Sequence, residues 1–185
     1  MRAVHHGTRV RTRQRGGAAA LWTLIVVPAL VGSLLFIADA GRVWLARIEL
    51  QSALEGAALA GVQTYRATGD ASQARNVAQQ YAAANLSGGV PVAIALNGGN
   101  AANGDILTGS VTGPDANLAF NLSGNPNCGV TDFGVGAQAA HAFPSLFQSF
   151  LGQAFGPYTV RGRAFARDSC ATNARQLVRI ATVNP

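Results

Sequence analysis

The feature that most restricts this chain is a long stretch near its start that holds no charged residue. It runs from Gly16 to Ala38, and most of its side chains are apolar. A helix of about 20 apolar residues crosses the ~30 Å hydrocarbon core of a bilayer. In water, a helix that is apolar on every side must be buried inside a large core, and a chain of 185 residues offers little room for that. We therefore predict a transmembrane helix over residues 16–40.

The residues around this stretch predict how it sits in the membrane. Trp22 and Trp44 are separated by roughly 33 Å along a helix axis, which would place one indole near each interface. Pro28 lies between them and is tolerated in a membrane helix. Five arginines precede the stretch, and the charges just after it nearly cancel; the five are Arg2, Arg9, Arg11, Arg13 and Arg15. The positive-inside rule then places the Arg-rich tail 1–15 in the cytoplasm and the C-terminal part in the periplasm. This predicts a single-pass membrane protein, which in a bacterium would lie in the inner membrane.

Three other interpretations of this region are less favoured. The arginines could form a nucleic-acid-binding arm, but basic residues next to a span are explained more simply as topology signals, so no nucleic acid is expected. Ala38-Asp39-Ala40 fits a signal-peptide cleavage pattern, yet the apolar run is longer than the ~7–15 residues of a signal core. The third alternative is a buried helix of a soluble protein.

The helical pattern continues beyond the predicted span, over a periplasmic extension at 41–86. One face of this extension carries only small residues, namely Ala53, Gly56, Ala57, Ala60 and Gly61. Small residues three and four positions apart allow another backbone to approach closely. We favour packing of this face against the globular part of the same chain. A helix-to-helix contact in an assembly stays open as the alternative.

The rest of the chain predicts an α+β fold. Thr68-Gly69 indicates the end of the first helix, and Asp70 with Gln73 indicates a capping box that starts a second helix over about 71–85. A Gly/Asn-rich linker over 87–103, with a strand candidate at 90–96, leads to a β-rich domain at 104–185. Its strand candidates are 105–112, 117–122, 130–142 and 158–167. A short Phe-rich helix is expected between the last two strands, covering the sheet or contacting lipid or a partner. The long transmembrane helix would thus extend into the periplasm and pack with a small antiparallel sheet.

Cys128 and Cys170 are the only cysteines in the sequence. In an oxidising compartment an even number of cysteines predicts a disulfide. Closing the loop between them would stabilise the fold by roughly 4 kcal/mol before strain is subtracted. Two cysteines without further ligands do not make a metal site.

Few residues are suited to catalysis. The sequence has no lysine, and its eight acidic residues are scattered. His5 and His6 lie in the tail, and His141 lies in a strand candidate without a recognisable serine or acid partner. The Gly-rich segment at 97–100 lacks the lysine of a phosphate-binding loop. We expect no enzyme activity, no cofactor, no metal and no small-molecule substrate.

The segment RQRGGAAALWTLIVVPALVGSLLFIADAGRVWLARIELQSALEGAALAG resembles the N-terminal region of TadE/TadG-like proteins of tight-adherence (Flp-type) pilus systems. The shared features are an Arg-Gly start, a proline within the apolar run, an acid just after it (Asp39), and an Ala/Gly-rich stretch from Leu50 to Gly61. The resemblance is looser over 104–167. It implies a membrane-anchored structural or accessory component of a pilus assembly or secretion apparatus, acting by positioning and protein–protein packing. Its partners would be the lipid bilayer and other pilus-assembly or envelope proteins.

The resemblance also implies a candidate processing site at Gly16 or Gly17. Pilins and the pseudopilin-like TadE group carry a glutamate five residues into the processed chain, whereas the corresponding residue here is Leu21 or Trp22. The sequence is therefore closer to the TadG-like pattern, which keeps its anchor. The alternative is an anchored or released envelope binding module unrelated to pili.

Overall fold

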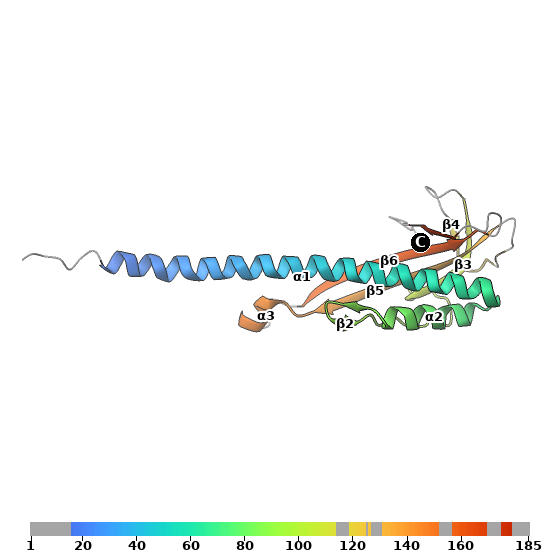
Figure 1. The fold of residues 1–185 in the computed structure, drawn as a ribbon, viewed down its shortest axis with the longest axis horizontal. Coiled ribbons are helices and arrows are strands. Elements are labelled where there is room, and N and C mark those ends of the chain that lie inside the picture. The colour runs from blue at the N-terminus through green and yellow to red at the C-terminus, as the bar shows by residue number, and fades with distance from the viewer. Residues whose placement is uncertain are drawn as a thin grey trace, which may run out of the picture.

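The long apolar helix predicted from the sequence is present in the computed structural model, which describes residues 16–113, 119–124, 126, 131–151, 157–169 and 175–178. Helix α1 spans Gly16–Thr68, 53 residues. Its first half projects as a rod away from a module built around its second half (Figure 1). The large apolar side chains between Leu21 and Ile37 are 42% to 72% exposed, except for Leu35, which is half-buried. The α+β class and the long N-terminal helix are confirmed.

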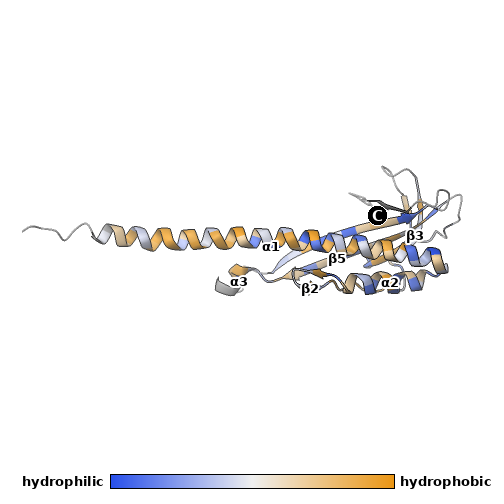
Figure 2. Cartoon of the chain, in the orientation of Figure 1, coloured by the Kyte–Doolittle hydropathy of each residue, from blue (hydrophilic) through white to orange (hydrophobic). Residues whose placement is uncertain are grey.

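Among the described residues, α1 is the one helix that is long and apolar enough to cross a membrane. Its most apolar 18-residue stretch is not buried in the protein. Figure 2 shows the apolar colouring along this rod. The hydroxyls of Thr23 and Ser33 donate to the carbonyls of Ala19 and Ala29, at 2.6 and 2.8 Å. These bonds satisfy the hydroxyl donors inside the helix, so both residues are compatible with an apolar surrounding.

The turn between α1 and the second helix follows the local signals in the sequence. Gly69 adopts φ +70°, and its N–H donates to the carbonyl of Tyr65 at 2.7 Å. This left-handed conformation is available to glycine without strain and ends α1. The Asp70 carboxylate accepts from the N–H groups of Ser72 and Gln73 and caps α2, Ala71–Ala83. Helix α2 then runs back along α1 (Figure 1).

A five-stranded antiparallel sheet forms the other layer of the module. Its strands are β3 (Ile106–Thr112), β4 (Ala119–Asn121), β5 (Asp132–Phe143), β6 (Tyr158–Asp168) and β7 (Arg175–Val178), in the order β4-β3-β5-β6-β7. The two long strands pair along their length, from Phe133 opposite Asp168 to Phe143 opposite Tyr158. Four of the strands lie where the sequence predicts them. Strand β7 was not predicted.

Residues 87–103, expected to form a linker, contribute to the packed module. Strands β1 (Leu86–Ser87) and β2 (Val90–Pro91) form a small hairpin in place of one strand over 90–96. Val92 and Ile94 are buried in the core. Asn100 adopts φ 51°, and its side-chain amide donates to the carbonyls of Thr108 and Leu122 at 2.6 and 2.9 Å. These bonds tie the segment to β3 and to the turn after β4.

The core lies between the second half of α1, helix α2 and the sheet. Its largest fully buried apolar side chains are Leu50, Leu54, Ile106, Val62, Val92 and Val135. Leu50 and Leu54 pack close to Gly162 of β6, where an added Cβ would lie 2.9 Å from a Leu54 methyl group. Strand β6 therefore needs a glycine at this contact.

For the short helix between the last two long strands, the sequence left two positions open: covering the sheet, or contacting lipid or a partner. Helix α3 spans Leu146–Leu151 and lies beyond the end of the sheet, beside α1 (Figure 1). The expectation that it covers a face of the sheet is therefore not confirmed. The physical reason is a hydrogen-bonded contact with α1 that links residues more than 100 positions apart.

Candidate functional site

Asp39 links the projecting half of α1 to the module. Its side chain is only 2% exposed, although it directly follows the apolar run. The carboxylate accepts from the Leu146 N–H at 2.8 and 3.0 Å, and from the Phe147 N–H at 3.4 Å. Arg42, one turn further along α1, lies 3.7 Å from the same carboxylate. Asp39 thus caps the first turn of α3 from another helix.

The chain before α3 prepares it for this contact. Ser145 is 1% exposed, and its hydroxyl accepts from the N–H of Gln148 at 2.8 Å, as an N-cap residue does. Asp39 and Ser145 together satisfy three of the N–H groups that a helix start leaves without partners. The sequence indicated Asp39 only as an acid just after the apolar run, and the contact with α3 was not predicted. Pro144-Ser145 was a usable local signal for a helix start, while nothing in the sequence pointed to Asp39 as its partner.

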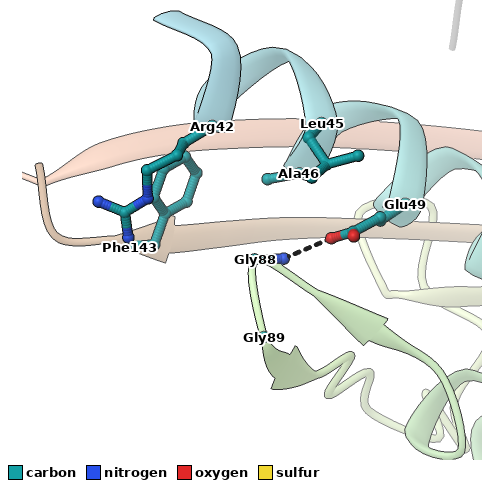
Figure 3. A pocket seen from close by; sticks show the side chains of 7 residues that line it. All are labelled: Arg42, Leu45, Ala46, Glu49, Gly88, Gly89 and Phe143. Atoms are coloured by element: carbon teal, nitrogen blue, oxygen red, sulfur yellow. Dashed lines mark hydrogen bonds between the residues drawn. The ribbon is translucent and has the colours of Figure 1, made fainter. Parts of the chain in front are cut away.

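A half-open hollow of about 150 Å³ lies next to this contact, between α1, the β1–β2 turn and the end of β5 (Figure 3). Its lining residues are Arg42, Leu45, Ala46, Glu49, Gly88, Gly89 and Phe143. The Glu49 carboxylate accepts from the Gly88 N–H at 2.8 Å. The Ser87 hydroxyl, which is fully buried, donates to the carbonyl of Ala46 at 2.9 Å. The β1–β2 turn is therefore attached to α1 by two hydrogen bonds.

The hollow has few groups that could carry chemistry. Glu49 already serves the turn, and Arg42 is paired with Asp39 and 44% exposed. The remaining lining is apolar or glycine. A nucleophile with an adjacent base, the minimum for covalent catalysis, is not among these seven residues. The arrangement is suited to holding the module at the end of the rod.

The small-residue face of α1 lies against α2. An added Cβ at Gly56 would lie 2.3 Å from the ring of Tyr81, and one at Gly61 would lie 3.0 Å from Val135 and 3.3 Å from the Ala74 carbonyl. The remaining members of the face, Ala53 and Ala57, are buried, and Ala60 is half-buried. On the facing side of α2 the buried residues are Ala74, Ala78 and Ala82. Close approach of two backbones within one chain is thus the use the structure makes of these residues.

The described carboxylates all have structural partners. Beyond Asp39, Glu49 and Asp70, Asp168 pairs with Arg66 at 3.1 Å, Asp132 lies 3.9 Å from Arg167, and Asp105 accepts from the Ala95 N–H. Glu55 accepts from the Gln51 amide at 3.0 Å. In the part of the chain that the structure describes, no three His, Cys, Asp or Glu side chains gather as metal ligands would.

The remaining predicted site residues are at the ends of the described chain or beyond it. Helix α1 begins at Gly16, and Gly17 is exposed with no heavy atom within 4 Å of an added Cβ. Cys128 and Cys170 lie outside the described residues. Their neighbours in sequence are informative, because Phe133 of β5 and Asp168 of β6 are paired. The described chain therefore brings the segment that follows Cys128 and the segment that precedes Cys170 to the same end of the sheet.

The comparison with protein families falls on this same helix. A family model described as "Putative Flp pilus-assembly TadE/G-like" matches residues 16–64. This segment, about a quarter of the chain, is therefore similar to that family. The match begins where α1 begins and ends four residues before α1 does, so it covers the rod, Asp39 and the packed half of the helix. No curated protein and no solved structure matches the chain.

Proposed function

We propose that this protein is a membrane-anchored structural or accessory component of a Tad (Flp) pilus assembly or secretion apparatus. The observation that carries the proposal is the position of the TadE/G-like match. The match covers a helix whose first half exposes apolar side chains and whose second half is packed in a folded module. The protein would act by positioning and by protein–protein packing, with no catalytic step.

The mechanism follows from the continuity of α1. One uninterrupted helix passes from the exposed apolar rod into the core of the module, so the span and the module move as one unit. Glu49 and Asp39 add two further attachments at the end of the rod, to the β1–β2 turn and to α3. A module held in this way stays at a set height above the bilayer, where other envelope proteins can pack against it.

The topology belongs to the same proposal. Residues 1–15 would stay in the cytoplasm and the module would lie in the periplasm, since the arginines of the tail precede the rod. The bilayer and other pilus-assembly or envelope proteins are the partners. The described carboxylates form ion pairs or accept hydrogen bonds from other groups of the fold, and this supports a role without catalysis.

The experiment that tests the proposal is the isolation of the full chain from bacterial membranes that contain a Tad system. We expect an uncut chain that resists carbonate extraction, with an intact mass that includes Gly16 and Gly17. After mild crosslinking, it should co-purify with the pilus ATPase or the secretin.

Two results would contradict the proposal in different ways. A new N-terminus at Gly17 or Ala18 would indicate a processed pseudopilin. Release of the module into the soluble fraction, with a new N-terminus at Gly41, would support a binding module of the envelope.

A further inference from the structure

Helix α3 is joined to α1 at the level where the apolar rod ends. Asp39 directly follows the charge-free run, and its carboxylate holds the first two N–H groups of α3. Residues 18–38 of α1 measure about 30 Å, the thickness of the hydrocarbon core. If this run spans the bilayer, Asp39 lies at the edge of the hydrocarbon, and α3 lies at the same depth.

The composition of α3 is unusual for a helix on the outside of a protein. Its sequence, LFQSFL, holds no charge, and the surrounding sequence from Phe133 to Val160 contains no Asp, Glu, Lys or Arg. Leu146 and Phe147 are only partly buried, and the helix lies beyond the sheet (Figures 1 and 2). The side chains of Leu146 and Phe147 are therefore not fully enclosed by the core of the module.

The residues of α1 just beyond Asp39 include groups that are found at a membrane interface. Trp44 is 68% exposed, and its indole lies five residues beyond Asp39 on α1. Arg42, 44% exposed, is a cation at a level where lipid phosphates would lie. Aromatic rings and basic residues are favoured at this depth. The Asp39 carboxylate is kept from contact with lipid because α3 and Arg42 cover it.

We propose that α3 is a second membrane contact of this protein and lies in the bilayer interface on the side of the module. This inference rests on the proposed membrane anchor. The rod alone fixes the height of the module but leaves it free to tilt and to rotate about the helix axis. An apolar helix in the interface, displaced sideways from α1, would restrict both motions and present one defined face of the module to its partners.

Fluorescence quenching by lipids tests this inference on the full chain. Phe147→Trp is made in a background with Trp22→Phe and Trp44→Phe, and the protein is reconstituted into phosphatidylethanolamine/phosphatidylglycerol vesicles. Some vesicles contain lipids brominated near the headgroup. Leu96→Trp in the same background is the matched control, because Leu96 is an exposed apolar residue of the module outside α1 and α3. A third protein keeps Trp22 as its sole tryptophan and reports on the anchor.

The expected result is at least about a twofold loss of emission from Phe147→Trp in brominated vesicles, as an interfacial helix requires, with little change for Leu96→Trp. Leu146→Trp replaces Phe147→Trp if the latter lowers the thermal transition of the module. The inference would be overturned if Trp22 is quenched while the tryptophans of Phe147→Trp and Leu146→Trp are not. That result would indicate that α3 faces water or a protein partner. An unquenched Trp22 would instead overturn the membrane anchor itself.

Discussion

Replacement of Asp39 by alanine should release α3 from α1 and leave most of the module folded. The carboxylate accepts two backbone N–H groups, those of Leu146 and Phe147, in a nearly fully buried position. A hydrogen bond to a charged group contributes about 1.5–3 kcal/mol, and the Phe147 bond is long, so it contributes at the low end or below. The pair with Arg42, at 3.7 Å and half-exposed, adds at most about 1 kcal/mol.

The expected local cost is therefore about 2–4 kcal/mol for opening α3. Hydrogen exchange of the full chain in detergent micelles, read by mass spectrometry of peptides, measures it directly. In Asp39→Ala, amide protection over Leu146–Leu151 should fall by about two orders of magnitude, since 1.4 kcal/mol is a factor of ten. Asp39→Asn keeps one acceptor oxygen without the charge, and we expect an intermediate loss.

Glu49→Ala is the matched control for this experiment. It removes another α1 carboxylate that accepts a backbone N–H, from Gly88, ten residues further along the helix. It should expose the β1–β2 turn to exchange and leave α3 protected. Unchanged protection of α3 in Asp39→Ala, or an equal loss in Glu49→Ala, would refute the assignment of Asp39 as the cap of α3.

Two further predictions concern the packing and the covalent structure of the module. Gly61→Val should lower the free energy of unfolding of the module by about 1–3 kcal/mol, measured by urea unfolding. The reason is that an added Cβ already meets Val135 at 3.0 Å and the Ala74 carbonyl at 3.3 Å. Gly17→Val, where an added Cβ meets no heavy atom within 4 Å, is the control, and equal effects of the two changes would contradict the packing argument. Cys128→Ser should lower stability by roughly 2–4 kcal/mol in oxidising buffer, with no further loss on adding a reductant; an unchanged melting temperature of the parent protein on reduction would show that the predicted disulfide is absent.

The geometry gives the segment that matches the TadE/G-like family model a mechanical interpretation. Residues 16–64 contain the bare rod, the capping carboxylate and the small-residue face, and each of these makes a different kind of contact. The apolar window of the rod is not buried in the protein. The carboxylate holds α3, and the small residues hold α2. Our proposal that the protein positions a module at a membrane rests on this division of one helix into successive contacts.

Local features of this protein follow from its sequence alone. The bare apolar half of α1, the stop at Gly69 and the cap at Asp70 each depend on residues within one or two helical turns. Strands β3, β5 and β6 likewise follow from apolar runs between turn residues. In each case the decisive interaction joins residues that are close in the chain, so the local sequence is sufficient to predict the feature.

Contacts between distant residues were decided only by the tertiary structure. The Ala/Gly face of α1 permits close approach of any backbone, and the sequence cannot tell α2 of the same chain from a neighbouring subunit. Asp39 lies 107 positions from Leu146, and no local pattern relates them. Strand β5 pairs with β6 as far as Phe143, and this pairing of distant residues places the chain that leads into α3. An interaction that depends on the summed geometry of several elements leaves no periodic or spaced signal in the sequence.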